Sequence, residues 1–130
     1  MELLQPSNWA RPRGYSNGTA ASGRTVSVSG MIGWDGQCQF HTDDFAGQAR
    51  QALRNVVEVL AEAKALPEHI VRMTWYVVDK KEYLGASKEV GAAYRDIIGR
   101  HYPAMTAVQV VALIEDRARL EIEVTAIVPE

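Results

Sequence analysis

The sequence predicts an α+β fold in which one mixed β-sheet carries two helices on one face. Two stretches place apolar residues at the three- and four-residue spacing of an amphipathic helix. Runs of β-branched and aromatic residues separate these stretches, and the last run alternates strictly between apolar and polar residues. The predicted order of elements is therefore β-β-α-β-α-β-β, and the 130 residues, 1–130, are expected to form a single domain.

The first elements are short strands among turn-forming residues. Residues 1–24 are rich in Pro, Gly, Ser and Asn, and we expect a short edge strand near the start, followed by a loop. The Asn-Gly pair at 17–18 predicts a turn, because both residues tolerate positive φ. Residues 25–29 alternate as a strand that ends at Gly30, and Trp-Asp-Gly at 34–36 predicts the next turn.

The first helix has a recognisable start and end. Thr42 is placed to cap it, and Asp43 and Asp44 put negative charge at the positive end of the helix dipole. Pro67, after Leu66, stops the helix, because proline lacks the amide hydrogen that a helix interior needs. The apolar stripe in between consists of Phe45, Ala49, Ala52, Leu53, Val56, Leu60 and Ala63.

A strand, a helix and two final strands follow. Residues 70–78 are rich in Val, Thr, Trp and Tyr and predict the strand, and residues 82–99 predict the helix. Residues 103–110 and 120–126 predict the two C-terminal strands. The buried side of the second helix is expected to consist of Val90, Tyr94, Ile97 and Ile98.

The last strand has one apolar and one acidic face. Because side chains in a strand alternate, Glu121, Glu123 and Thr125 point away from the apolar residues between them. A sheet face with two carboxylates is not expected under the helices, so it faces water, a cleft or a partner. Subunit association is a natural way to cover such a face. The apolar residues of this strand are Leu120, Ile122, Val124 and Ala126.

Composition narrows the classes of function. The net charge is −2 and the Lys and Arg residues are scattered, so the sequence does not favour nucleic-acid binding, which usually uses a basic patch. No apolar run reaches the roughly 18 residues of a membrane helix. The N-terminus has neither a basic start nor an apolar signal core, so we expect a cytoplasmic protein.

Cofactor and metal motifs are not recognisable. Cys38 is the single cysteine, so no internal disulfide is expected, and no base that would activate its thiol lies close in sequence. His41, His69 and His101 have no second ligand at metal-binding spacing, so we expect no metal site. The glycines at 14–18 lack the lysine and the following helix of a phosphate-binding loop.

The ordered set of residues resembles the RidA/YjgF family, also called the YjgF/L-PSP group, over nearly the whole chain. The resemblance implies a chorismate-mutase-like α+β fold and a homotrimer with a small-molecule ligand in each intersubunit cleft. It also implies cofactor-free hydrolysis of enamines or imines to a keto acid and ammonia. The residues that carry the resemblance are Gly14-Tyr15-Ser16, Val28-Ser29-Gly30, Gln48 through Asn55-Val56, 71–79, Tyr94, Pro103-Ala104 and Glu121-Ile122-Glu123.

The resemblance also implies roles for individual residues. Glu121 matches the family carboxylate that positions or activates the attacking water, a role that requires hydrogen-bond reach of that water. Tyr15 matches the tyrosine that lines the cleft, and Ser29, Gly30 and Met31 would form its floor. The alternative for Glu121 and Tyr15 is an ordinary structural contact at a subunit interface.

The chain departs from the deaminase pattern at the substrate-binding residues. Met105 stands where the family arginine grips the substrate carboxylate, and losing such an ion pair costs roughly 2–5 kcal/mol. Ala107 replaces a family cysteine, and Gly91 stands where many relatives have asparagine. Met105 and Trp34 could make the pocket apolar, which favours a larger or aromatic ligand, and the alternative for both is that they fill the core or an interface. Candidates for a substitute charge are Arg24, Arg72 and Arg119.

These departures leave three functions open. The first is imine or enamine hydrolysis on a non-standard substrate. The second is a trimer that binds a small ligand without catalysis, which the loss of arginine at Met105 favours. The third is an endoribonuclease, which the acidic balance of the chain disfavours.

Overall fold

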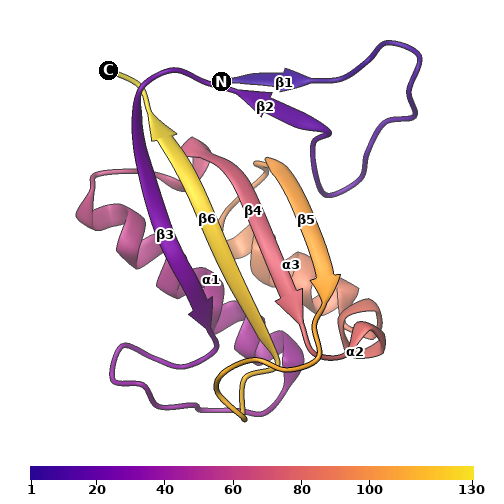
Figure 1. Cartoon of the computed structure of the whole chain (residues 1–130), viewed down its shortest axis with the longest axis vertical. Helices are drawn as coiled ribbons and strands as arrows, with labels where there is room; N and C mark the ends of the chain where they lie inside the picture. The colour runs from indigo at the N-terminus through magenta and orange to yellow at the C-terminus, as the bar shows by residue number, and fades with distance from the viewer.

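The computed structural model describes all residues, 1–130, and its centre is a four-stranded sheet in the order β3-β6-β4-β5. The strands are β3 (Arg24–Ile32), β6 (Leu120–Val128), β4 (Ile70–Val77) and β5 (Ala104–Gln109). β4 and β5 are parallel and the other neighbours are antiparallel, so the sheet is mixed. Figure 1 looks onto its open face, with α1 and α3 behind the sheet. The predicted α+β architecture is confirmed.

The helix α1 (Phe45–Glu62) provides most of the cover for the sheet. Its predicted apolar stripe is buried against Met73, Trp75 and the inward residues of β6, except for Ala63, which is half-buried and follows the last residue of the helix. Asp44 caps the helix by accepting a hydrogen bond from the Gly47 amide at 2.9 Å, so the prediction that Thr42 is the cap is wrong. The Thr42 hydroxyl instead accepts a hydrogen bond from the amide of Asp44, the capping residue itself, at 3.0 Å.

The chain turns sharply between α1 and β4. Lys64 adopts a left-handed conformation with φ of 57° just after the helix ends. Pro67 then opens a single 3-10 turn, η1 (Pro67–His69), which leads into β4. The helix therefore ends ahead of Pro67, as the sequence predicts.

The single helix expected at 82–99 is two helices. α2 (Lys80–Gly85) is capped by the Asp79 carboxylate, and α3 (Ser87–Ile97) begins after a break at Ala86. The break follows Gly85, and glycine is a poor helix former. The predicted buried side of the second helix is confirmed: Ile98 belongs to the core, and Val90, Tyr94 and Ile97 pack against it.

The N-terminal segment forms a separate hairpin. β1 (Glu2–Leu4) pairs with β2 (Gly18–Ala20) in a two-stranded sheet beside the ends of β4 and β5 (Figure 1). Gly18 lies in β2 rather than in a turn, so the turn predicted at 17–18 is wrong. The Thr19 hydroxyl donates to the Val71 carbonyl at 2.6 Å, which ties this hairpin to the main sheet.

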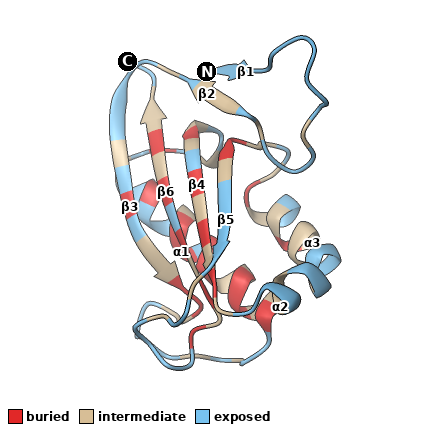
Figure 2. Cartoon of the chain, turned by 45° about the vertical axis from the view of Figure 1, so that its right-hand side comes forward, coloured by how far each residue is buried: buried red, intermediate tan, exposed pale blue.

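The two faces of the sheet differ as the alternation predicts. In β6 the apolar residues Leu120, Ile122, Val124 and Ala126 are buried, while Glu121 is half-buried and Glu123 is exposed. Figure 2 shows buried segments alternating with less buried ones along β4 and β6. β3 is longer than predicted, because it continues past Gly30 through a bulge between Val28 and Met31. None of the helices has the length and apolar character needed to cross a membrane.

Candidate functional site

Glu121 lies on the open face of the sheet, directly against the bulge in β3. A Cβ atom on Gly30 would sit only 2.5 Å from Glu121 Oε2, so a glycine is needed for the carboxylate to lie where it does. Ser29, before Gly30, is exposed at the same bulge. Of the predicted floor residues, Gly30 therefore does lie beside the predicted catalytic carboxylate, and Ser29 is its exposed neighbour in the bulge.

Met31 is placed differently from its neighbours. It pairs with Ile122 across β3 and β6, and its half-buried side chain packs against the hydrophobic core. The bulge shifts the register by one residue, and this shift turns the Met31 side chain toward the helices. Only the backbone of Met31 is left for a role beside Glu121.

Tyr76 is a polar neighbour of Glu121 that the sequence did not single out. It pairs with Glu121 across β4 and β6, and its hydroxyl donates to Glu123 Oε1 at 2.5 Å. This hydrogen bond, with partial burial and the charges of Glu123 and Glu121, raises the pKa of Tyr76. Glu123 thus has a phenol partner, and no hydrogen bond within the chain engages the Glu121 side chain.

A pocket of about 640 Å³ lies on the other side of the sheet, where β5 meets α2 and α3. Met105 contributes to its wall, because Met105 pairs with the core residue Met73 and therefore points toward the helices. Most of the lining is apolar or aromatic. The ring-bearing residues of the wall are Tyr15, Trp75, Tyr83, Tyr94 and Tyr102.

Backbone pairing holds Tyr15 at the mouth of this pocket. Ser16 forms a parallel bridge with Ala104, and its amide donates to the Pro103 carbonyl at 3.0 Å. The Ser16 hydroxyl donates to the carbonyl of Tyr102. These contacts fix the chain next to β5, and the Tyr15 side chain remains 41% exposed.

Tyr94 and Tyr102 form a rigid part of the pocket wall. Their rings stack with centroids 5.4 Å apart and an interplanar angle of 11°. The Tyr94 hydroxyl donates to the His101 carbonyl. Burial, with a smaller contribution from Tyr102, raises the pKa of Tyr94, so its phenol stays protonated at neutral pH.

The predicted site residues fall into two groups on one chain. Tyr15 and Met105 line the pocket on the helix side of the edge strand β5, and Ala107 is exposed further along this strand. Glu121 and Gly30 lie on the open face, with β4 between β6 and β5. One copy of the chain therefore does not bring all of these residues into one cavity.

None of the three arginines proposed as substitute charges lines the pocket. Arg24 Nη2 donates to the Ala63 carbonyl at 2.7 Å, and Arg119 Nη2 pairs with Glu82 Oε2 at 2.6 Å. Arg72 is exposed and lies in a hollow beside the N-terminal hairpin. The pocket instead contains Arg13 and Arg95, which sequence reasoning missed. The position of Arg13, immediately before Gly14-Tyr15, was the available clue.

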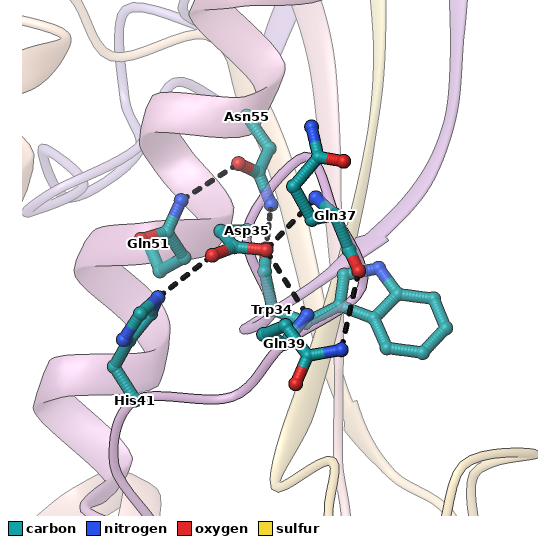
Figure 3. A network of polar contacts seen from close by, with 7 residues as sticks. All are labelled: Trp34, Asp35, Gln37, Gln39, His41, Gln51 and Asn55. Atoms are coloured by element: carbon teal, nitrogen blue, oxygen red, sulfur yellow. Dashed lines mark hydrogen bonds and ion pairs between the residues drawn. The ribbon is translucent and has the colours of Figure 1, made fainter.

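Trp34 does not line the pocket either, contrary to the suggestion that it makes the pocket apolar. It belongs to the loop between β3 and α1, where its ring lies 5.7 Å from that of Phe40. Figure 3 shows the polar network of this loop: Asp35 accepts the amides of Gln37 and Gln39 and contacts His41, and Asn55 of α1 donates to the Trp34 carbonyl. These contacts order the loop.

The three histidines are each engaged in local structure. His41 Nε2 lies 2.7 Å from Asp35 Oδ2, and His69 Nδ1 accepts the Leu66 amide at 2.9 Å. His101 Nε2 lies 2.7 Å from the Ile70 carbonyl oxygen. No group of three or more potential metal ligands is found in the structure.

An open-faced mixed sheet with helices on one side, and a pocket at its edge strand, defines a recognisable class of small α+β proteins. A family model described as Endoribonuclease L-PSP matches residues 8–128 of the chain. The chain therefore belongs to this family, the RidA/YjgF family that its sequence resembles.

Characterised relatives and solved structures agree with this membership. The human 2-iminobutanoate/2-iminopropanoate deaminase is 33% identical over 105 residues, which are 80% of this chain and 73% of the relative. The Drosophila melanogaster RutC family protein UK114 is 31% identical over 97% of this chain and 88% of its own length. The Rid family protein YyfB from Yersinia pestis, at 28% identity, superposes with a TM-score of 0.85 over 98% of both chains. Mycobacterium tuberculosis Rv2704, at 34% identity, gives a TM-score of 0.65 over 88% of this chain and 87% of its own.

Proposed function

We propose that this chain hydrolyses the C=N bond of an imine, without a cofactor, in a cleft between two subunits of a homotrimer. The observation that carries the proposal is the division of the site residues between two surfaces. The pocket with Tyr15 and Met105 opens beside the β5 edge, whereas Glu121 lies on the open face of the sheet. A second copy that lays its open face against the β5 edge would bring its own Glu121 to the mouth of this pocket.

The surface around β5 supports such an association. β5 is an edge strand, and Val108 on it is exposed on the open-face side. Val111 and Ile114 in the following loop are fully exposed. The pairing with Ser16 covers β5 only at Ala104. Exposed apolar residues grouped beside an otherwise unpaired strand edge are typical of a surface that a partner covers.

The proposed chemistry is the addition of water to an imine carbon. Glu121 accepts a proton from the water as the water oxygen bonds to carbon, and returns this proton to the nitrogen as the C=N π bond opens. The hydroxyl proton of the resulting carbinolamine then passes through Glu121 to the nitrogen, and a carbonyl forms as the C–N bond breaks and ammonia leaves. Glu121 is suited to the role of base because no hydrogen bond within the chain occupies its carboxylate. The names of the deaminase relatives support this reaction class.

The test uses imino acids that an amino-acid oxidase generates in place, with keto-acid formation followed over time. The wild-type chain should accelerate keto-acid formation. Glu121→Gln should remove most of this acceleration, because losing a general base typically lowers the rate by about a hundredfold or more. Glu123→Gln is the matched control, because Glu123 lies two residues further along the same face of β6 and its carboxylate accepts a hydrogen bond from Tyr76. Equal effects of the two substitutions would contradict the role of Glu121.

A non-catalytic trimer that binds a small ligand is the second candidate. Met105 favours it, because a thioether cannot hold a carboxylate as a guanidinium does. Ligand binding without any acceleration of imine hydrolysis would decide in its favour. The cytoplasmic location expected from the sequence stays a prediction.

A further inference from the structure

The pocket beside Met105 contains two arginines and no acidic residue. Arg13 enters from the segment before Tyr15, and Arg95 from the last turn of α3. The ion pairs of the chain are formed by other residues, so neither guanidinium is neutralised by a carboxylate of its own chain. Two unpaired guanidinium groups beside an apolar cavity favour an anionic ligand.

Gly91 allows Arg95 to lie along the pocket. Residues 91 and 95 are one helical turn apart on α3, and Arg95 Nη1 lies 3.4 Å from where a Cβ atom on Gly91 would be. The guanidinium therefore lies beside Gly91, where a Cβ atom would already be in contact with it. Arg95, although exposed, is one of the residues that line the cavity together with Met105.

The remainder of the cavity suits a bulky apolar group. Its volume of about 640 Å³ is within the range of roughly 300–1,000 Å³ typical of small-molecule sites, so a ligand with a methyl side chain would leave most of it to water. The tyrosine rings supply faces on which an aromatic ring can stack.

We propose that this pocket binds the carboxylate of a 2-imino acid through Arg95 and Arg13, and that its aromatic wall selects a large aromatic side chain. Arg95, on α3, would thus supply the charge that Met105, on β5, does not. The inference rests on the proposed function for the identity of the reacting group, and its binding component can be measured without catalysis.

The experiment is calorimetric titration of the intact protein with phenylpyruvate, the keto-acid product of such a substrate. Phenylacetone, which lacks the carboxylate, and pyruvate, which lacks the ring, are the comparison ligands. We expect phenylpyruvate to bind more tightly than either. Arg95→Gln and Arg13→Gln should each weaken phenylpyruvate binding about tenfold or more, the effect of losing a charged hydrogen bond, and leave phenylacetone binding unchanged.

Two further variants separate the specific effect from a general loss of charge. Arg54→Gln removes one positive charge from an exposed position on α1 that does not line the pocket, and it should leave binding unchanged. Met105→Arg, combined with Arg95→Gln, should restore phenylpyruvate binding, because it places a guanidinium in the same pocket from β5 instead of from α3. Circular dichroism and light scattering of every variant verify that fold and assembly are intact.

Several outcomes would overturn the inference: no binding of phenylpyruvate, equal binding of phenylacetone or pyruvate, or equal losses for Arg54→Gln and Arg95→Gln. Failure of the proposed function has a different signature. In that case phenylpyruvate binds through the arginines as expected, but the wild-type chain does not accelerate hydrolysis of the corresponding imine.

Discussion

The carboxylate of Glu121 lies across the bare Cα of Gly30, and a Cβ atom at residue 30 would come within 2.5 Å of Oε2. The atoms in conflict are the end of a flexible side chain, so Gly30→Ala can be absorbed by moving the carboxylate. We therefore expect a change in stability within about 1 kcal/mol but a fall in kcat of about tenfold or more. Thermal unfolding and imine hydrolysis, measured on the same preparation, check the two parts. Unchanged kcat would show that the position of this carboxylate does not matter.

Gln48 is predicted to be a main determinant of stability. Its fully buried amide donates to the carbonyls of Thr42 and Arg117, at 3.1 and 3.0 Å, and accepts the Arg119 amide at 2.8 Å. Gln48→Leu would leave these backbone groups without partners, so we expect a loss of about 2–4 kcal/mol in the free energy of unfolding. Urea denaturation measures it. Gln51→Leu, on the same helix but half-buried, is the control and should lose clearly less.

Tyr94 is expected to make the chain sensitive to alkaline pH. Its raised pKa means that the folded chain keeps the phenol proton at pH values where the unfolded chain, with a pKa of about 10, releases it. The contribution of Tyr94 to stability is therefore complete below about pH 10 and is lost as the pH rises further. Tyr94→Phe should lower Tm at pH 8, because the bond to the His101 carbonyl is lost, but flatten the decline of Tm above pH 10. Parallel declines for the two proteins would contradict this.

The proposed trimer predicts a particle mass of three times the 14.4 kDa of the chain by light scattering at micromolar concentration. Val108→Lys places a charge on the exposed edge strand and should shift the particle toward the monomer, since burying an unpaired ammonium group is unfavourable. Leu66→Lys is the matched control, because Leu66 is equally apolar and exposed but precedes the η1 turn, away from β5. A monomeric wild-type mass would refute the intersubunit cleft.

The sequence predicted the architecture well, because the helical stretches and the strands from β3 onward carry strong periodic patterns. Its errors are local. The break at Ala86 depends on a single glycine inside an otherwise helical pattern, and the position of Gly18 in β2 depends on pairing with the distant residue Leu4. A turn dipeptide reports local backbone preference, and tertiary pairing can override it.

The candidate site was less predictable, because strand order decides which residues meet. The pairing of Met105 with Met73 turns it toward the helices, away from the face that carries Glu121. Arg95 looks in the sequence like an ordinary surface charge near a helix end, and only the fold of the chain places it on the lining of the pocket. Neither relationship is visible in a single sequence.

The position of Glu121 and Met105 on opposite sides of one sheet has a consequence for genetic complementation. In the proposed trimer, a chain damaged at Glu121 still carries an intact pocket, and a chain damaged at Arg95 still carries an intact carboxylate. Two inactive alleles would then complement each other when their products assemble together. With random mixing, about one cleft in four would combine an intact pocket from one chain with an intact Glu121 from its neighbour. Heterozygous cells would then regain part of an activity that neither parent strain possesses.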